Sequence, residues 1–251
     1  MSFNQLKVND IEKIFIKIYE NACELLEEAE LLYNHEKYAR AYLCAHIAFE
    51  EFGKLPMLNT VALNVYNGVK TDWKYLNKRI RNHHRKISQS WGTVMMFRGI
   101  HNKYETYSKQ SNTVIEHDSL YDEFDYIKEF KAFLESDYFF TPEEFVKYME
   151  ELEITEQLKQ KYSMTMLLNE YKNGSLYADF DEDILLKPSE KIDKEICEFG
   201  LINALIQKKF IDIPNIHKEG FRLYRLTDEH NQWLEAINKK YKEQFEKLKQ
   251  K

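Results

Sequence analysis

Between Asp10 and Asn34 the chain repeats apolar side chains at steps of three and four residues, which places them on one face of an α-helix. The repeating residues are Ile11, Ile14, Phe15, Ile18, Ala22, Leu25, Leu26, Ala29 and Leu32. The turn His35-Glu36-Lys37 is so short that the next helix must return antiparallel beside the first. With only seven glycines and four prolines in 251 residues, the chain has few places to turn, and we expect long helices.

The stretch Lys37–Pro56 predicts the second helix. Glu51 falls on its apolar stripe, and an unpartnered buried charge costs several kcal/mol. Glu51 is therefore expected either to form a buried ion pair or to take part in the chemistry of a functional site. Gly53 would cost roughly 1 kcal/mol against alanine, so we expect another backbone to approach closely there. Lys54 is spaced to reach Glu50 or Glu51. The two stripes of this helix are Ala41, Cys44, Ala48 and Leu55, and beside them Tyr38, Tyr42, Ala45, Phe49 and Phe52.

The net charge of −6 hides a division along the sequence. Residues 70–109 contain ten basic residues against Asp72 and Glu105, whereas residues 116–160 contain fourteen acidic residues against four lysines. A basic segment can face phosphate while an acidic one repels it, or the two can neutralise each other across the fold. The sequence leaves both interpretations open.

A third helix is predicted from about Thr71, and it carries the basic residues. Leu76, Ile80, His84, Ile87 and Trp91 recur at helical steps, so the pattern predicts one continuous helix with His84 among apolar neighbours.

Further helices are expected downstream. Thr141, Pro142 and Glu144 form a helix start, and Asn173-Gly174 are expected to end a helix. Residues 175–180, SLYADF, suit a strand or an extended segment. Ser189 can cap a helix that runs to about Lys209, and Thr227 can cap the last one.

Three short motifs resemble the AbiV family of phage abortive-infection proteins, which is grouped with the HEPN domains. They are the residues Ala48, Glu50, Glu51, Gly53 and Lys54, the run HHRKI from His83 to Ile87, and the run KNGSLYADF from Lys172 to Phe180. The resemblance covers roughly Asn21 to Phe180.

The resemblance implies a mainly α fold, a HEPN-like antiparallel helical bundle with additional C-terminal helices and at most a short β-hairpin. We expect a HEPN-like domain over residues 1–180 and a helical extension packed on it over 181–251. The run from Glu198 to Ile237 is also similar to the helix, hairpin and final helix of a winged-helix domain. The alternative for this run is an amphipathic helical hairpin that closes the bundle.

The family also implies a toxin-like, metal-independent endoribonuclease that cuts RNA and halts translation on infection. Such cleavage needs a base, an acid and positive charge at the phosphate. His84 is the candidate acid or base, and Glu51 could fix its tautomer. Arg79 and His84 match the lower limit of the HEPN Arg-x(4–6)-His pattern, although Ile80 follows the arginine where a polar residue is common. Arg81 precedes the polar Asn82 but has no histidine at the right distance, so the choice between the two arginines stays open.

The remaining candidate residues are expected to bind RNA or to support the site. We predict contacts to RNA phosphate from Lys54, His83, Arg85, Lys86, Lys172 and Tyr177, with Glu50 and Gly53 in supporting positions. The sequence has no Gly-rich phosphate loop, no G-x-S-x-G elbow and no His-Glu-x-x-His zinc helix, so no cofactor or metal is expected. The alternative function is a non-catalytic HEPN-like module that binds RNA, a phage protein or an inhibitory partner.

The family resemblance and the hydropathy of the chain also give expectations for the protein's partners and its location in the cell. HEPN-like domains commonly pair, so we expect a homodimer, with a phage-encoded activator or an antitoxin-like inhibitor as possible partners. No run approaches the ~18 apolar residues of a membrane span, and the N-terminus lacks the pattern of a signal peptide. We expect a soluble cytoplasmic protein whose three cysteines are reduced.

Overall fold

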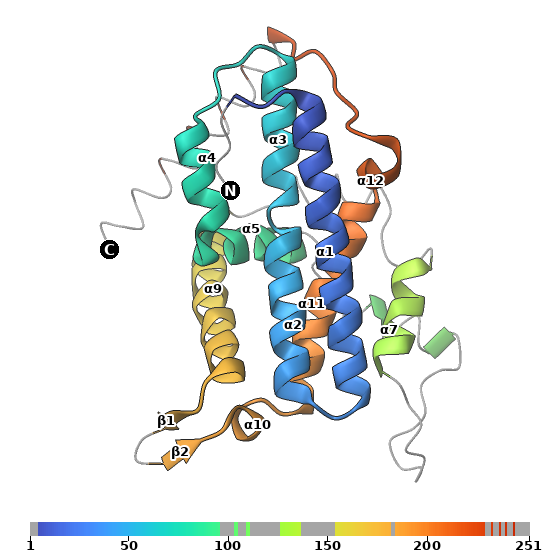
Figure 1. The fold of residues 1–251 in the computed structure, drawn as a ribbon, viewed down its shortest axis with the longest axis vertical. Coiled ribbons are helices and arrows are strands. Elements are labelled where there is room, and N and C mark those ends of the chain that lie inside the picture. Colours follow the sequence, from blue (N-terminus) through green and yellow to red (C-terminus); the bar gives the residue numbers. More distant parts are fainter. Residues whose placement is uncertain are drawn as a thin grey trace.

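The computed structural model describes residues 5–95, 103–104, 109–110, 126–136, 154–181 and 184–228, together with positions 232, 236, 239 and 243. It confirms the predicted fold class, a mainly α bundle with one small β-hairpin (Figure 1). The elements are α1 (Val8–Asn34), α2 (Tyr38–Phe52), α3 (Leu55–Tyr66), α4 (Trp73–Arg81), α5 (His83–Met95), α7 (Tyr126–Glu135), α9 (Ile154–Leu176), β1 (Asp179–Asp181), β2 (Ile184–Leu186), α10 (Pro188–Lys191), α11 (Lys194–Asp212) and α12 (Ile216–Glu219).

Helices α1 and α2 form the antiparallel pair that the sequence predicts. The connection between them turns with a positive φ of 58° at Glu36. Helix α1 continues beyond α2 and also lies beside α3 (Figure 1). Helix α2 is buried on most of its surface, because α1, α5, α9 and α11 all pack on it. Tyr42, Phe49 and Phe52 are almost completely buried there, so α2 is the central helix of the core.

Helix α2 ends at Phe52 with Gly53 as its C-cap, and α3 begins at Leu55, with Pro56 in its first turn. Proline is tolerated there because the first amides of a helix have no partner within the helix. Helix α3 ends at Tyr66, and Gly68 follows with a positive φ of 71°.

The prediction of one continuous basic helix after Thr71 is wrong. The helix breaks at Asn82, whose extended backbone (φ −86°, ψ 115°) separates α4 from α5. Asn82 then caps α5, since its Oδ1 accepts a hydrogen bond from the Arg85 amide at 2.9 Å. Because α5 starts as a new helix, its side chains do not continue the apolar stripe of α4. As a result His84 is exposed, although Ile80 and Ile87 of the same predicted stripe are buried.

Helix α9 runs past Asn173 and Gly174 to Leu176, so the predicted helix end at these two residues is wrong. A Cβ at Gly174 would meet nothing closer than the Lys191 side chain at 3.6 Å, so this glycine is tolerated inside the helix. The predicted extended segment forms β1, which pairs antiparallel with β2 and places Phe180 opposite Leu185. The helix start predicted at Thr141–Glu144 lies outside the described residues.

Helix α11 packs on α1 and α2 and belongs to the same core as they do. The N-cap of α11 is Asp193, whose carboxylate accepts a hydrogen bond from the Ile196 amide at 2.9 Å. The short helix α10, which begins at Pro188, precedes it. The predicted division at residue 180 stays a prediction.

The described residues 213–228 contain no strand, although the winged-helix comparison expects a hairpin there. Two of their amides are bonded to side chains of the bundle instead. The Phe221 amide donates to Glu12 at 3.1 Å, and the Leu226 amide donates to Asn67 at 3.0 Å. The helix predicted from Thr227 lies mostly outside the described residues.

We predict that Gly53→Ala lowers the free energy of unfolding by about 1–3 kcal/mol, the usual range for overpacking. A Cβ at Gly53 would lie 2.3 Å from Ser90 Oγ and 2.7 Å from the Lys86 carbonyl oxygen. The second atom belongs to the α5 backbone and cannot move away cheaply. Urea denaturation followed by circular dichroism measures the difference.

Gly174→Ala is the matched control. It also adds one methyl group to a helical glycine, but the nearest atom, on the Lys191 side chain, lies at an ordinary contact distance of 3.6 Å. It should therefore leave stability unchanged or raise it by up to ~1 kcal/mol. Equal effects of the two substitutions would contradict the role assigned to the close approach at Gly53.

Candidate functional site

The carboxylate of Glu50 is the centre of a buried polar cluster that joins three helices. Its side chain is only 3 % exposed. Lys86 Nζ of α5 lies 2.5 Å from Oε2, His83 Nδ1 of α5 lies 2.7 Å from Oε2, and His46 Nε2 of α2 lies 3.3 Å from Oε1. Lys172 Nζ of α9 lies 3.9 Å from Oε1. A single carboxylate therefore faces basic groups from α2, α5 and α9.

Burial and hydrogen bonding act in opposite directions on Glu50. Desolvation would raise its pKa, but hydrogen bonds from His46 and Lys86 and the positive charge of Lys86 outweigh that effect and hold the pKa at about 2. Burial lowers the pKa of His46, against the opposing influence of Glu50. Near neutral pH the cluster therefore holds an ionised carboxylate and a neutral His46.

His83 differs from the other members because its side chain is 59 % exposed. Its Nδ1 faces both Glu50 oxygens, at 3.0 and 2.7 Å. Since an ionised carboxylate can only accept, Nδ1 must carry the proton that it donates. In the neutral ring this leaves the lone pair on Nε2, on the opposite side of the imidazole. Glu50 thus fixes the tautomer and the orientation of a solvent-accessible histidine.

The local sequence explains why two residues of α5 reach the same carboxylate. The Asn82 cap begins α5 at His83, and Lys86 follows one turn later on the same face. Residues three apart on a helix are neighbours, so both side chains meet Glu50. Lys172 is held beside them by a 3.0 Å hydrogen bond to Asn169 Oδ1.

The structure separates the predicted catalytic residues. The motif spacing predicts Glu51 opposite the His84 helix, but it is Glu50 that meets α5, through His83. Glu51 instead forms an ion pair with Lys54. His84 is exposed in the first turn of α5.

The two candidate arginines lie in different surroundings. Arg81 is the last residue of α4 and is exposed. Arg79 is half-buried, and its Nη2 donates to Gln89 Oε1 at 3.0 Å. The hydrogen bond of Arg79 is therefore made to Gln89 and not to His84. The roles predicted for His84, Arg79, Arg81 and Glu51 stay predictions.

The predicted phosphate-binding residues fall into two groups. His83, Lys86 and Lys172 meet at Glu50. The others lie elsewhere: Arg85 is exposed on α5, Lys54 pairs with Glu51, and Tyr177 is 62 % exposed between α9 and β1. Sequence reasoning gave Glu50 only a supporting position. The four-residue spacing of His46 and Glu50 on a largely apolar helix was the available signal for a buried pair.

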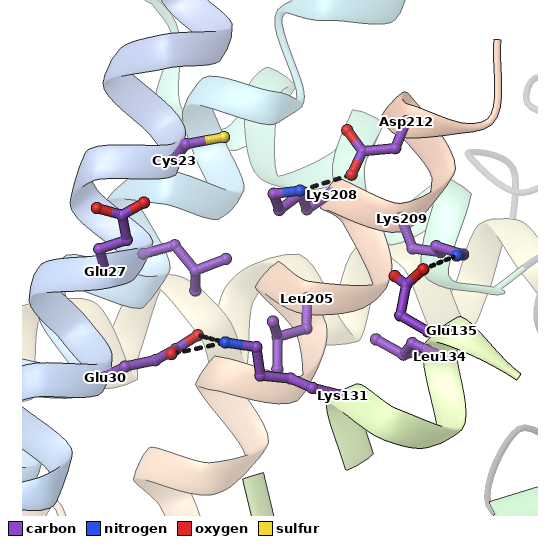
Figure 2. Close-up of a pocket in the computed structure, with 11 residues that line it drawn as sticks. Cys23, Glu27, Glu30, Lys131, Leu134, Glu135, Leu205, Lys208, Lys209 and Asp212 are labelled. Carbon is purple, nitrogen blue, oxygen red and sulfur yellow. Dashed lines mark hydrogen bonds and ion pairs between the residues drawn. The ribbon is translucent and has the colours of Figure 1, made fainter. Parts of the chain in front are cut away.

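A hollow of about 230 Å³, away from the Glu50 cluster, lies between α1, α7 and α11 (Figure 2). Its lysines are already paired with acids of the same hollow. The pairs are Lys131 with Glu30 at 2.8 Å, Lys208 with Asp212 at 2.5 Å and Lys209 with Glu135 at 3.0 Å. Two of them tie α7 to α1 and α11, which gives this hollow a structural explanation.

In the part of the chain that the structure describes, no group of three or more His, Cys, Asp or Glu side chains could hold a metal ion. No described helix combines the length and the apolar composition needed to cross a membrane.

Comparison with protein-family models assigns the chain to a family. A model of a HEPN-type family matches residues 10–206. That family is AbiV, and the chain belongs to it. The match confirms the resemblance and makes the protein a HEPN-type member of an abortive-infection family. A search of curated proteins and a search of solved structures each found no match.

We predict that Glu50 makes the protein sensitive to acid. A carboxyl group whose pKa falls from 4.5 in the unfolded chain to about 2 in the fold contributes stability above pH 4.5. This contribution is lost as the pH falls from 4.5 towards 2, because the folded protein must then take up the proton. Glu50→Gln should flatten the pH dependence of the free energy of unfolding in that window. It should also lower stability at pH 7 by about 3–5 kcal/mol, since it leaves buried cations unpartnered.

Glu51→Gln is the matched control, because it changes the adjacent carboxylate, which has one lysine partner. It should cost less stability than Glu50→Gln, because only one cation loses its partner, and it should leave the acid slope in place. An acid slope that survives Glu50→Gln unchanged would contradict the assignment.

Proposed function

We propose that this AbiV protein is a metal-independent endoribonuclease in which His83, oriented by Glu50, transfers protons. The observation that carries the proposal is the 2.7 Å contact between His83 Nδ1 and a buried, ionised carboxylate, on a ring that is 59 % exposed. Cleavage of RNA would halt translation in an infected cell, as the family implies.

The chemistry is an internal transesterification. The 2′-oxygen attacks the adjacent phosphorus while a base removes its proton, and the bond from phosphorus to the 5′-oxygen breaks as that oxygen gains a proton. The products are a 2′,3′-cyclic phosphate and a free 5′-hydroxyl. Neutral His83 can accept a proton at Nε2, and its protonated form can donate one. Glu50 is a positioning residue, because it acts on the substrate only through His83.

Positive charge near the histidine supports the same proposal. Two ammonium groups, Lys86 and Lys172, lie within 4 Å of the single Glu50 carboxylate. The cluster therefore keeps an excess of positive charge. The exposed Arg81 and Arg85 flank the turn from which His83 projects. An arginine fork suits a phosphate that gains charge in the transition state.

We predict that purified protein incubated with total RNA in EDTA produces discrete fragments that end in 2′,3′-cyclic phosphate. His83→Ala should lower the rate by about 10²-fold or more, the range of general acid–base groups. The exposed neighbour His84 is changed in parallel. If His84→Ala abolishes cleavage and His83→Ala does not, the proton-transfer role belongs to His84, as the sequence pattern first indicated.

The substitution Glu50→Gln tests whether Glu50 orients His83 for cleavage or only stabilises the fold. The amide can accept through its oxygen but cannot stabilise an imidazolium, so the folded fraction should cleave more slowly and with a changed pH profile. A loss of stability with an unchanged specific activity and pH profile would assign Glu50 a structural role alone.

The homodimer stays a prediction. Two copies that pair near α4 and α5 would bring two basic helices to one groove. Light scattering at micromolar concentration should then give twice the mass of the chain, and mixing His83→Ala with intact protein should lower activity more than dilution does. A fully active monomer would exclude a composite site. A phage-encoded activator or an antitoxin-like partner likewise stays a prediction.

A non-catalytic binding module is the second candidate. The observation in its favour is that the Glu50 cluster also has a structural explanation, since it locks α2, α5 and α9 together. Such a module would bind RNA or a protein partner without producing cyclic phosphate ends. Binding of RNA by both intact protein and His83→Ala, with no cleavage by either, would favour it.

A further inference from the structure

A groove of about 260 Å³ separates α3 from α4, and nothing in the proposed cleavage step uses it. Its walls are one face of α3 and one face of α4, and residues 70–72 lie at one end. The half-buried Arg79, bonded to Gln89 of α5 at 3.0 Å, also lines it. The buried Met57 and Leu76 give the groove an apolar part.

The polar side chains of the groove could recognise a ligand. No ion pair with a carboxylate is present for Lys70 or Arg79 among the described residues, so both cations can attract an anion. Asp72 is occupied as the cap of α4, where its carboxylate accepts from the Tyr75 amide at 2.9 Å. The buried Thr71 hydroxyl has no hydrogen-bond partner. The groove therefore combines positive charge with an unused buried hydroxyl.

Tyr75 adds an aromatic surface. Its side chain is 53 % exposed at the groove. An exposed ring beside arginine and lysine is the combination on which proteins stack the bases of single-stranded nucleic acid. The volume lies just below the range of about 300–1,000 Å³ typical of drug-sized ligands, so a single nucleotide fits it better than a large cofactor.

The groove lies close to the candidate site. Gln89 follows His83 by six residues on α5, which corresponds to about 9 Å along the helix axis. Arg79 precedes the Asn82 break by less than one turn of α4. A strand of RNA held at His83 could therefore place a neighbouring nucleotide between α3 and α4.

We propose that the α3–α4 groove binds one nucleotide of single-stranded RNA next to the cleavage point, with the base stacked on Tyr75 and its phosphate held by Arg79 and Lys70. This inference rests on the proposed function for its substrate. The binding itself can be measured without cleavage. The Gln89 amide lines the groove and can hydrogen-bond the ribose or the base edge.

The test uses a fluorescein-labelled 2′-O-methyl oligoribonucleotide, which has no 2′-hydroxyl and cannot be cleaved by the proposed route. Tyr75→Ala should weaken its binding roughly 5- to 100-fold in fluorescence anisotropy, the usual effect of losing one base–aromatic stack. Tyr75→Phe should keep most of the affinity. Lys70→Ala should weaken binding and reduce its salt dependence, because one phosphate contact is lost.

Two surface substitutions serve as matched controls. Tyr224, 51 % exposed, matches Tyr75 in chemistry and exposure but does not line the groove. Lys218 lies on α12, outside the groove. Neither Tyr224→Ala nor Lys218→Ala should change the affinity. Circular dichroism of each variant confirms that the bundle is folded.

The outcomes separate this inference from the proposed function. Equal binding by Tyr75→Ala and intact protein overturns the groove as an RNA subsite, whether or not RNA is cleaved. Loss of binding in Tyr75→Ala, in a protein that cleaves no RNA, supports the groove and removes the nuclease. A free 5′-mononucleotide that binds as tightly as the oligonucleotide would make the groove a site for free nucleotide and overturn the RNA subsite.

Discussion

The structure depends on the neutralisation of one buried carboxylate. Removing an ion from water costs several kcal/mol even after relaxation, and close, hydrogen-bonded partners must offset that cost. Glu50 has such partners in Lys86 and His83 of α5, and His46 Nε2 of its own helix lies 3.3 Å from the carboxylate. Because Lys172 of α9 faces the same carboxylate, the position of Glu50 constrains how α5 and α9 can lie against α2.

Close packing at the end of α2 reinforces this constraint. The Ser90 hydroxyl donates to the Phe49 carbonyl at 2.6 Å, and the α5 backbone approaches Gly53 so closely that a Cβ would not fit. Apolar packing alone tolerates small rotations of a helix, whereas a hydrogen-bonded charge and a backbone contact do not. The first turn of α5, which carries the exposed His83, is therefore held at a defined place on the bundle.

The break at Asn82 determines which histidine faces the carboxylate. In an uninterrupted helix the stripe through Ile80 and Ile87 would include His84. The extended residue and its side-chain cap restart the helix instead, with His83 turned towards Glu50 and His84 exposed. One capping asparagine thus determines that His83 faces Glu50 while the adjacent His84 is exposed.

The sequence by itself determined the helical class, the antiparallel pair α1–α2, the short extended segment after α9 and the family. These follow from local periodicity, turn length and short motifs, which act within a few residues. Only the tertiary structure decided that Glu50 rather than Glu51 meets α5. Adjacent residues on a helix point about 100° apart, so the choice rests on how α2 is rotated by the helices around it. The sequence of α2 is largely apolar, and the four-residue spacing of His46 and Glu50 is its one signal for that rotation.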